Sequence, residues 1–176
     1  MGVSGQDIAN KAARLFGSTS TTEDAYVLDA LIQNAPGFSI QVTDGGTAGS
    51  AVGEQIVGYA PYACQVVLCE LGPGVTAAAD NTDYVTFTLA KRTAGGSATT
   101  VATGDTRAAS LNGVTAFTPV ALPLSSTSGA VALAAGDAIT FKIVKSGAGK
   151  AIGAAATASG ASLNVFVQVK RLYTTT

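Results

Sequence analysis

The stretch with the clearest chemical suggestion is VKSGAGKAIG, residues 144–153, where glycines and lysines follow an apolar segment as in a phosphate-binding loop. That motif requires a glycine five positions before its final glycine, and a Ser or Thr directly after the lysine. Val144 and Ala151 occupy these two positions. We therefore predict that the glycines here permit a backbone turn with positive φ and that the loop binds no phosphate.

The acidic residues are the next candidates for chemistry, but their spacing is typical of turns. The sequence has no histidine, which is the commonest general base. Asp80 and Asp137 stand in turn-forming contexts, and Asp105 could form a surface ion pair with Arg107. A carboxylate pair could serve a glycosidase and ADNTDY (residues 79–84) could hold calcium, although the acids are too scattered for either. We expect a non-enzymatic protein without a metal or a cofactor.

Cys64 and Cys69 are five positions apart in YACQVVLCEL. On a regular strand this spacing directs the two side chains to opposite faces, about 16 Å apart. A disulfide needs Cα atoms within about 7 Å of each other, and the chain offers no histidine or further cysteine for a zinc site. We predict two buried free thiols.

Charge and hydropathy exclude several classes of partner. Charged residues make up 12% of the chain against about 25% in an average protein, and the net charge is −1. Basic residues occur singly or in pairs, so we expect no nucleic acid as a partner. No stretch reaches the roughly 20 apolar residues of a membrane span, and the first residues lack the apolar run of a signal peptide. We expect no membrane association, and synthesis in a cytoplasm.

Two regions differ in the period of their apolar residues. From residue 4 to about residue 36 the period is that of two short amphipathic helices, which would be marginal alone and need a surface to lie on. We predict an N-terminal helical arm over residues 1–37 and a β-sandwich domain over residues 38–176. The apolar stripes of the arm form a candidate partner-docking face, which consists of Ile8, Leu15, Phe16, Leu28, Leu31 and Ile32.

From Phe38 onward the apolar period is two, which is typical of strands with one buried face. Glycine-bearing turns separate these segments: ELGPGV, TAGGSA, SLNG, LAAGDA, SGAGKA and TASGAS. Pro119 and Pro123 follow a strand and favour strands that switch between sheets. The predicted fold is all-β, a jelly-roll-like antiparallel β-sandwich with a short helical N-terminal arm. The inward-facing residues are predicted to be Phe38, Ile40, Val42, Val85, Phe87, Leu89, Ile139, Phe141, Ile143, Leu163, Val165, Val167 and Val169.

Residues 55–172 resemble the jelly-roll decoration proteins, also called cement proteins, on the heads of tailed bacteriophages. Four segments carry the resemblance: VGYAPYACQVVLCELGPGVTAAADNTDYVTFTLAKRTAGG, ATTVATGDTRAASLNGVTAFTPVALPLSS, VALAAGDAITFKIVKSGAGKAIG and ASLNVFVQVKRL. The resemblance implies a virion structural protein on the capsid exterior, a homotrimer whose partner is the major capsid protein and which stabilises the assembled capsid.

A second class of function stays open at this point. Threonine-rich strands and five tyrosines could form a receptor- or glycan-binding face of an adhesin or fibre module, with a host-surface glycan as its partner. The absence of tryptophan weakens this alternative, because stacking on sugars favours the larger ring.

Overall fold

The computed structural model describes residues 37–42, 53–148 and 163–172, and these residues form strands joined by turns and loops. The strands are β1 (Gly37–Val42), β2 (Gln55–Tyr59), β3 (Cys64–Pro73), β4 (Val85–Arg92), β5 (Thr99–Asp105), β6 (Val120–Ala121), β7 (Ala132–Leu133), β8 (Ala138–Lys145) and β9 (Leu163–Arg171). None of the described segments forms a helix with the length and hydropathy of a membrane span.

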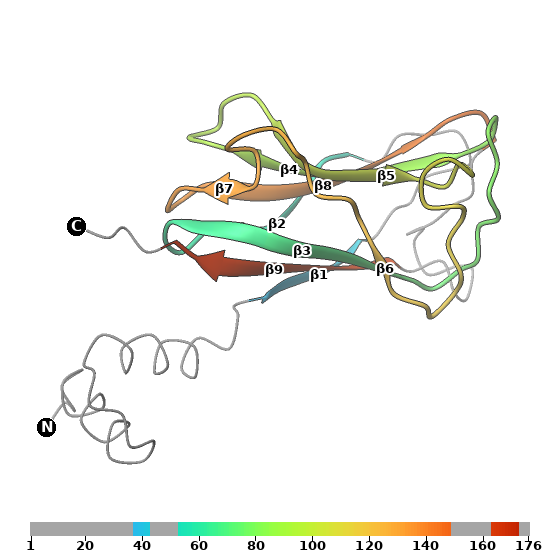
Figure 1. Cartoon of the computed structure of the whole chain (residues 1–176), viewed down its shortest axis with the longest axis horizontal. Coiled ribbons are helices and arrows are strands. Elements are labelled where there is room, and N and C mark those ends of the chain that lie inside the picture. The colour runs from blue at the N-terminus through green and yellow to red at the C-terminus, as the bar shows by residue number, and fades with distance from the viewer. Residues whose placement is uncertain (1–36, 43–52, 149–162, 173–176) are drawn as a thin grey trace, which may run out of the picture. The chain divides into compact units, whose positions relative to one another are not determined.

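The strands build two antiparallel sheets that face each other as a sandwich (Figure 1). One sheet has the order β1-β9-β3-β6, with β7 also paired to β3, and the other has the order β2-β8-β4-β5. Consecutive strands from β1 to β4 alternate between the sheets, and the first strand pairs with the last. This order is that of a jelly roll, so the predicted fold class is confirmed.

The edge strand beside β3 is broken into two short pieces. β6 pairs with Glu70 and Leu71 near one end of β3, and β7 pairs with Cys64 and Gln65 at the other. Between them the chain leaves the sheet and reaches across to β5, where Ala102 and Leu124 form an isolated bridge. Counting β6 and β7 as one interrupted strand gives each sheet four strands.

The apolar period of two places one face of each main strand in a common interior. The inward residues of β4, β8 and β9 are at most 1% exposed, as predicted, and Val42 of β1 is also buried. Phe38 and Ile40 are partly buried and pack against the same core. At roughly 25 cal/mol per Å² this burial is the main stabilising contribution to the fold. The core cluster comprises Val42, Ala60, Cys64, Val66, Cys69, Leu71, Ala77, Val85, Phe87, Leu89, Val101, Ala102, Val114, Leu122, Leu133, Ile139, Phe141, Ile143, Leu163, Val165, Val167 and Val169.

Close approach of the two sheets depends on a glycine at one position. A Cβ atom on Gly58 of β2 would lie 2.5 Å from Cδ1 of Phe38, which belongs to β1 in the opposite sheet. Glycine is therefore the residue that lets the Phe38 ring fill the space between the sheets.

Three of the six predicted turns, TAGGSA, SLNG and LAAGDA, lie in full where the sequence placed them. In TAGGSA, Ala94 and Gly95 have positive φ, and the N–H of Gly96 donates to the carbonyl of Thr93. SLNG and LAAGDA turn through glycines at positions 113 and 136. The predicted turn at ELGPGV is wrong at its start, because β3 continues to Pro73 and pairs with β9 over this length. TASGAS lies outside the described residues, and so does the predicted helical arm before Gly37.

Replacement of Phe141 by Ala should lower the free energy of unfolding by about 3–5 kcal/mol, because the ring is 1% exposed and its loss leaves a cavity. Chemical denaturation monitored by circular dichroism measures the difference. Ile56→Ala is the control, since Ile56 is 52% exposed and its replacement should cost less than about 1 kcal/mol. Equal losses for the two variants would contradict this assignment of the core.

Candidate interaction surfaces

The glycine loop after β8 acts as a backbone turn over the part that the structure describes. Gly147 has a φ of +55°, and the N–H of Ala148 donates to Oδ1 of Asp83 at 2.7 Å. The Asp83 carboxylate thus binds a loop amide and would repel a phosphate. This agrees with the predicted turn, while residues 149–153 lie outside the described part of the chain.

The acids of the predicted turns bind backbone amides, as expected. Oδ1 of Asp80 accepts hydrogen bonds from the N–H groups of Thr82 and Asp83 at 2.7 and 3.0 Å, and these bonds lower the pKa of Asp80. Oδ2 of Asp137 accepts from the N–H of Ala134 at 2.8 Å. Within residues 37–42, 53–148 and 163–172, no three His, Cys, Asp or Glu side chains gather as metal ligands would.

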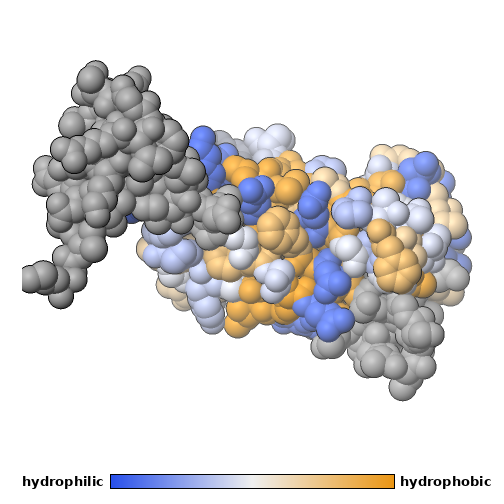
Figure 2. Space-filling model, turned by 90° about the horizontal axis from the view of Figure 1, so that it is seen from below, coloured by the Kyte–Doolittle hydropathy of each residue, from blue (hydrophilic) through white to orange (hydrophobic). Residues whose placement is uncertain are grey.

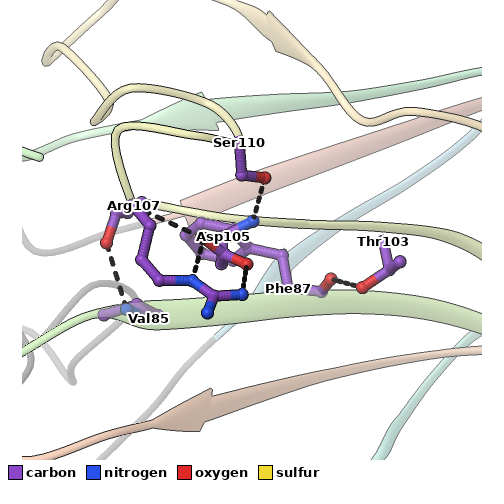
Figure 3. Close-up of polar contacts among 7 residues, drawn as sticks. Val85, Phe87, Thr103, Asp105, Arg107 and Ser110 are labelled. Carbon is purple, nitrogen blue, oxygen red and sulfur yellow. Dashed lines mark hydrogen bonds and ion pairs between the residues drawn. The ribbon is translucent and has the colours of Figure 1, made fainter. Parts of the chain in front are cut away.

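Asp105 and Arg107 form the predicted ion pair at the end of β5 (Figure 3). Arg107 donates from Nε to Oδ1 at 2.9 Å and from Nη2 to Oδ2 at 2.7 Å, and its backbone N–H also donates to Oδ1. The Asp105 side chain is only 11% exposed, so the acidic half of the pair is buried and not on the surface. Hydrogen bonds from Arg107 lower the pKa of Asp105.

Neighbouring contacts show that this pair stabilises a turn. Ser110 Oγ accepts from the backbone N–H of Asp105, Thr106 Oγ1 accepts from that of Val85, and the Arg107 guanidinium lies 4.5 Å from the centre of the Tyr84 ring. Every oxygen of the Asp105 carboxylate already accepts a charged donor. The cluster is therefore built to hold the chain as it leaves the sheet.

Cys64 and Cys69 are both free and fully buried in the core, so the prediction that they face opposite sides of the strand is wrong. The cause is a β-bulge between Val66 and Leu68, which shifts the alternation of β3 by one residue. Burial raises the pKa of Cys69 to about 12 and also raises that of Cys64. Both thiols act as small apolar core residues, as predicted.

The outer surface of the β2-β8-β4-β5 sheet, which we call the threonine face, carries four threonines, of which Thr88 and Thr140 are buried at 9% and 4% exposure. Its register brings Thr88 beside Thr103 and Lys142, and Thr86 beside Val144. Large apolar side chains are exposed at its margin, with Ile56 at 52% and Tyr59 at 58%. The members of the threonine face are Ile56, Tyr59, Thr86, Thr88, Thr103, Thr140, Lys142 and Val144.

Glu54 covers one end of the threonine face. Its carboxylate accepts from Nε and Nη2 of Arg92 at 2.9 and 2.6 Å and also from the Thr140 hydroxyl. Arg92 and Thr140 belong to β4 and β8, so Glu54 ties the start of β2 to both strands. Hydrogen bonds from Arg92, and then from Thr140, lower the pKa of Glu54 to about 2.

The outer surface of the β1-β9-β3 sheet, which we call the amide face, is broad and nearly uncharged. Figure 2 views the molecule from this side and shows hydrophobic and hydrophilic residues interspersed over the face. Phe166 is 39% exposed and lies over Gly37, where a Cβ atom would be 2.5 Å from its Cε2. The residues of the amide face are Ser39, Gln41, Gln65, Val67, Leu68, Glu70, Asn164, Phe166, Gln168 and Lys170, of which only Glu70 and Lys170 are charged.

The structure brings together none of the residues proposed from the sequence as a partner-docking face, because Ile8, Leu15, Phe16, Leu28, Leu31 and Ile32 all lie outside the described residues. Phe117, which sequence reasoning did not single out, is the most exposed large apolar residue in the described part of the chain, at 85%. Its segment lacks regular alternation, so no periodicity could have marked it as an outward-facing residue.

No protein-family model matches the sequence, and neither does any curated protein. Among solved structures, the Eiger TNF of S. frugiperda is 12% identical, with a TM-score of 0.35, over 80% of this chain and 98% of that chain. A structure of infectious bursal disease virus, Gx strain, is 18% identical, with a TM-score of 0.32, over 80% of this chain and 37% of that chain. Neither likeness assigns a function, and the jelly roll is defined by the strand order itself.

The lowered pKa of Glu54 makes one contribution to stability pH-dependent. Because the folded-state pKa of about 2 lies below the ordinary 4.5, ionised Glu54 stabilises the fold above about pH 4.5, and this contribution is lost as pH falls toward 2. The difference in free energy of unfolding between wild type and Glu54→Gln should be constant above pH 5 and shrink toward pH 2. Urea titrations across this range measure it, and a difference independent of pH would contradict the assignment.

Proposed function

We propose that this protein is a non-enzymatic structural protein of a virus particle, which binds the outside of an assembled bacteriophage capsid as a homotrimer and stabilises it. The proposal rests on one observation, a contrast between the acidic side chains of the protein and its two outer sheet faces. Five of the six described carboxylates bind backbone amides, arginine or threonine, while two broad and nearly neutral sheet faces are left for contact. The sequence resemblance of residues 55–172 to phage decoration proteins supports the same function.

The physical role follows from mass action. A protein that binds the assembled lattice more tightly than the separate subunits stabilises the lattice by the difference in binding free energy. Neutral faces can be buried against a capsid subunit without desolvating charges, and three linked copies multiply a modest affinity through avidity. The partner is the major capsid protein, and the location is the capsid exterior after synthesis in the host cytoplasm.

Capsids that lack the protein should disrupt at a temperature several degrees lower than capsids to which the purified chain has been added back. Differential scanning calorimetry of the two preparations measures the shift, with an unrelated neutral protein added as the control. Identical disruption temperatures at saturating protein would exclude a stabilising role.

The N-terminal arm is proposed to dock on the capsid through its apolar stripes. Deletion of residues 1–35 should leave a folded sandwich, with unchanged circular dichroism in the β region, and weaken capsid co-sedimentation tenfold or more. A helix that buries about 400 Å² could contribute about 10 kcal/mol before ordering costs. Leu28→Ser with Leu31→Ser is the milder test of the same contact. Unfolding on deletion would place the helices in the core instead.

A glycan-binding adhesin is the second candidate, because Tyr59 is 58% exposed at the margin of the threonine face. An exposed aromatic ring can stack on the apolar face of a sugar. Binding on a glycan array, together with no co-sedimentation with capsids, would favour this function over the first.

A further inference from the structure

The loop that presents Phe117 is strained and rigidly held. Phe117 has a φ of +60°, a conformation that is costly for a bulky L-residue. Its N–H donates to the carbonyl of Pro73 at 2.8 Å, the N–H of Ala116 donates to Oγ1 of Thr76 at 3.0 Å, and Thr118 closes a turn onto Thr115. Backbone strain that is stabilised by its surroundings, at a residue 85% exposed, points to a role in binding.

Phe117 begins an extended apolar segment along the broken edge of the sandwich. We call residues 117–124, FTPVALPL, the apolar edge; its exposed members are Phe117, Thr118, Pro119, Ala121, Pro123 and Leu124. Two prolines lack backbone donors, so this edge is poorly suited to pairing with a further strand. Recognition at the apolar edge must therefore use side chains.

The apolar edge lies within a long uncharged stretch. Residues 108–136 contain no Asp, Glu, Lys or Arg, whereas an average protein would have about seven charged residues over this length. A partner surface rich in charge would lose its hydration here without gaining an opposite charge. A partner surface suited to the apolar edge is therefore one with few charged groups.

The chain itself carries such a surface. The amide face is broad and bears only Glu70 and Lys170 as charged members, and the ring of its central Phe166 lies close to Gly37. The amide face also continues into the apolar edge, because Ala121 pairs with Glu70, and Glu70 pairs with Phe166. One copy of the chain therefore carries two adjoining surfaces with few charges, the apolar edge and the amide face, which could contact each other between copies.

We propose that the apolar edge of one copy packs on the amide face of a second copy, with Phe117 seated near Phe166 and Val67. Contact between two different surfaces of the same chain is heterologous and can close into a ring, as the proposed homotrimer requires. A single exposed aromatic seated in a desolvated site commonly dominates the affinity of an interface. The inference rests on the trimeric assembly proposed above, and it names the surfaces that form it.

Sedimentation equilibrium of the full chain, without capsids, tests the contact directly. Wild type should sediment as a closed oligomer, and Phe117→Ala and Phe166→Ala should each raise its dissociation constant at least tenfold. Ile56→Ala is the matched control, because Ile56 is 52% exposed on the opposite sheet and should change the constant less than twofold. A monomeric wild type, or equal weakening by Ile56→Ala and Phe117→Ala, would overturn the proposal.

Phe117→Gly separates a binding role from a structural one. Glycine adopts positive φ without strain, so this variant should keep or raise its melting temperature while losing association. A lowered melting temperature with association intact would assign Phe117 to the fold and overturn the proposal.

Cross-linking identifies the two surfaces in contact. The native Cys64 and Cys69 are fully buried, so a short bismaleimide should react only with introduced cysteines. Thr118→Cys with Gln168→Cys should give covalently linked oligomers, whereas Thr118→Cys with Lys142→Cys on the threonine face should not. The reverse pattern would contradict an edge-to-face contact. Because this readout needs no capsid, its failure leaves the capsid-stabilisation test unaffected.

Discussion

Insertion of the last two strands into the middle of the two sheets is the constraint on which the fold depends. β9 lies between β1 and β3, and β8 lies between β2 and β4. Both strands bury one complete apolar row, with Phe141 and Ile143 on β8 and Val165 and Val167 on β9 at no more than 1% exposure. Neither sheet is complete until β8 and β9 have paired with strands that are distant in the sequence. The dominant contacts are therefore long-range, and folding is expected to be slow and cooperative.

Strands with one regular row of apolar residues were predicted well from the sequence. β1, β4, β8 and β9 follow simple alternation and were assigned to the correct faces. The bulge in β3 could not be foreseen from local residues, because it depends on the register with β9. As a result of the bulge, Cys64 and Cys69 point to the same side of the sheet and not to opposite sides, as had been predicted. The pairing of β3 with β9 also continues through the Gly-Pro sequence of the predicted turn ELGPGV, so that β3 ends only at Pro73. β6 and β7 are only two residues long, too short for any period.

The candidate surfaces were foreseen only in part. Alternation placed Phe87, Leu89 and Val165 inward and so left the residues between them outward, and turn chemistry explained Asp80 and Asp137. The exposure of Phe117 could not be predicted, because it results from hydrogen bonds between residues 114–118 and the segment around Pro73. Of the two described ion pairs, Asp105–Arg107 stabilises a turn and Glu54–Arg92 joins strands, while the wide faces carry few charged residues.

We propose that the neutral outer surfaces of this jelly roll act by binding an assembled capsid. Electron cryomicroscopy of capsids incubated with the purified chain tests it most directly. The account predicts three-fold clusters of sandwich-shaped density on the capsid exterior, in contact with the capsid subunits. Particles whose exterior stays bare at saturating protein would contradict it.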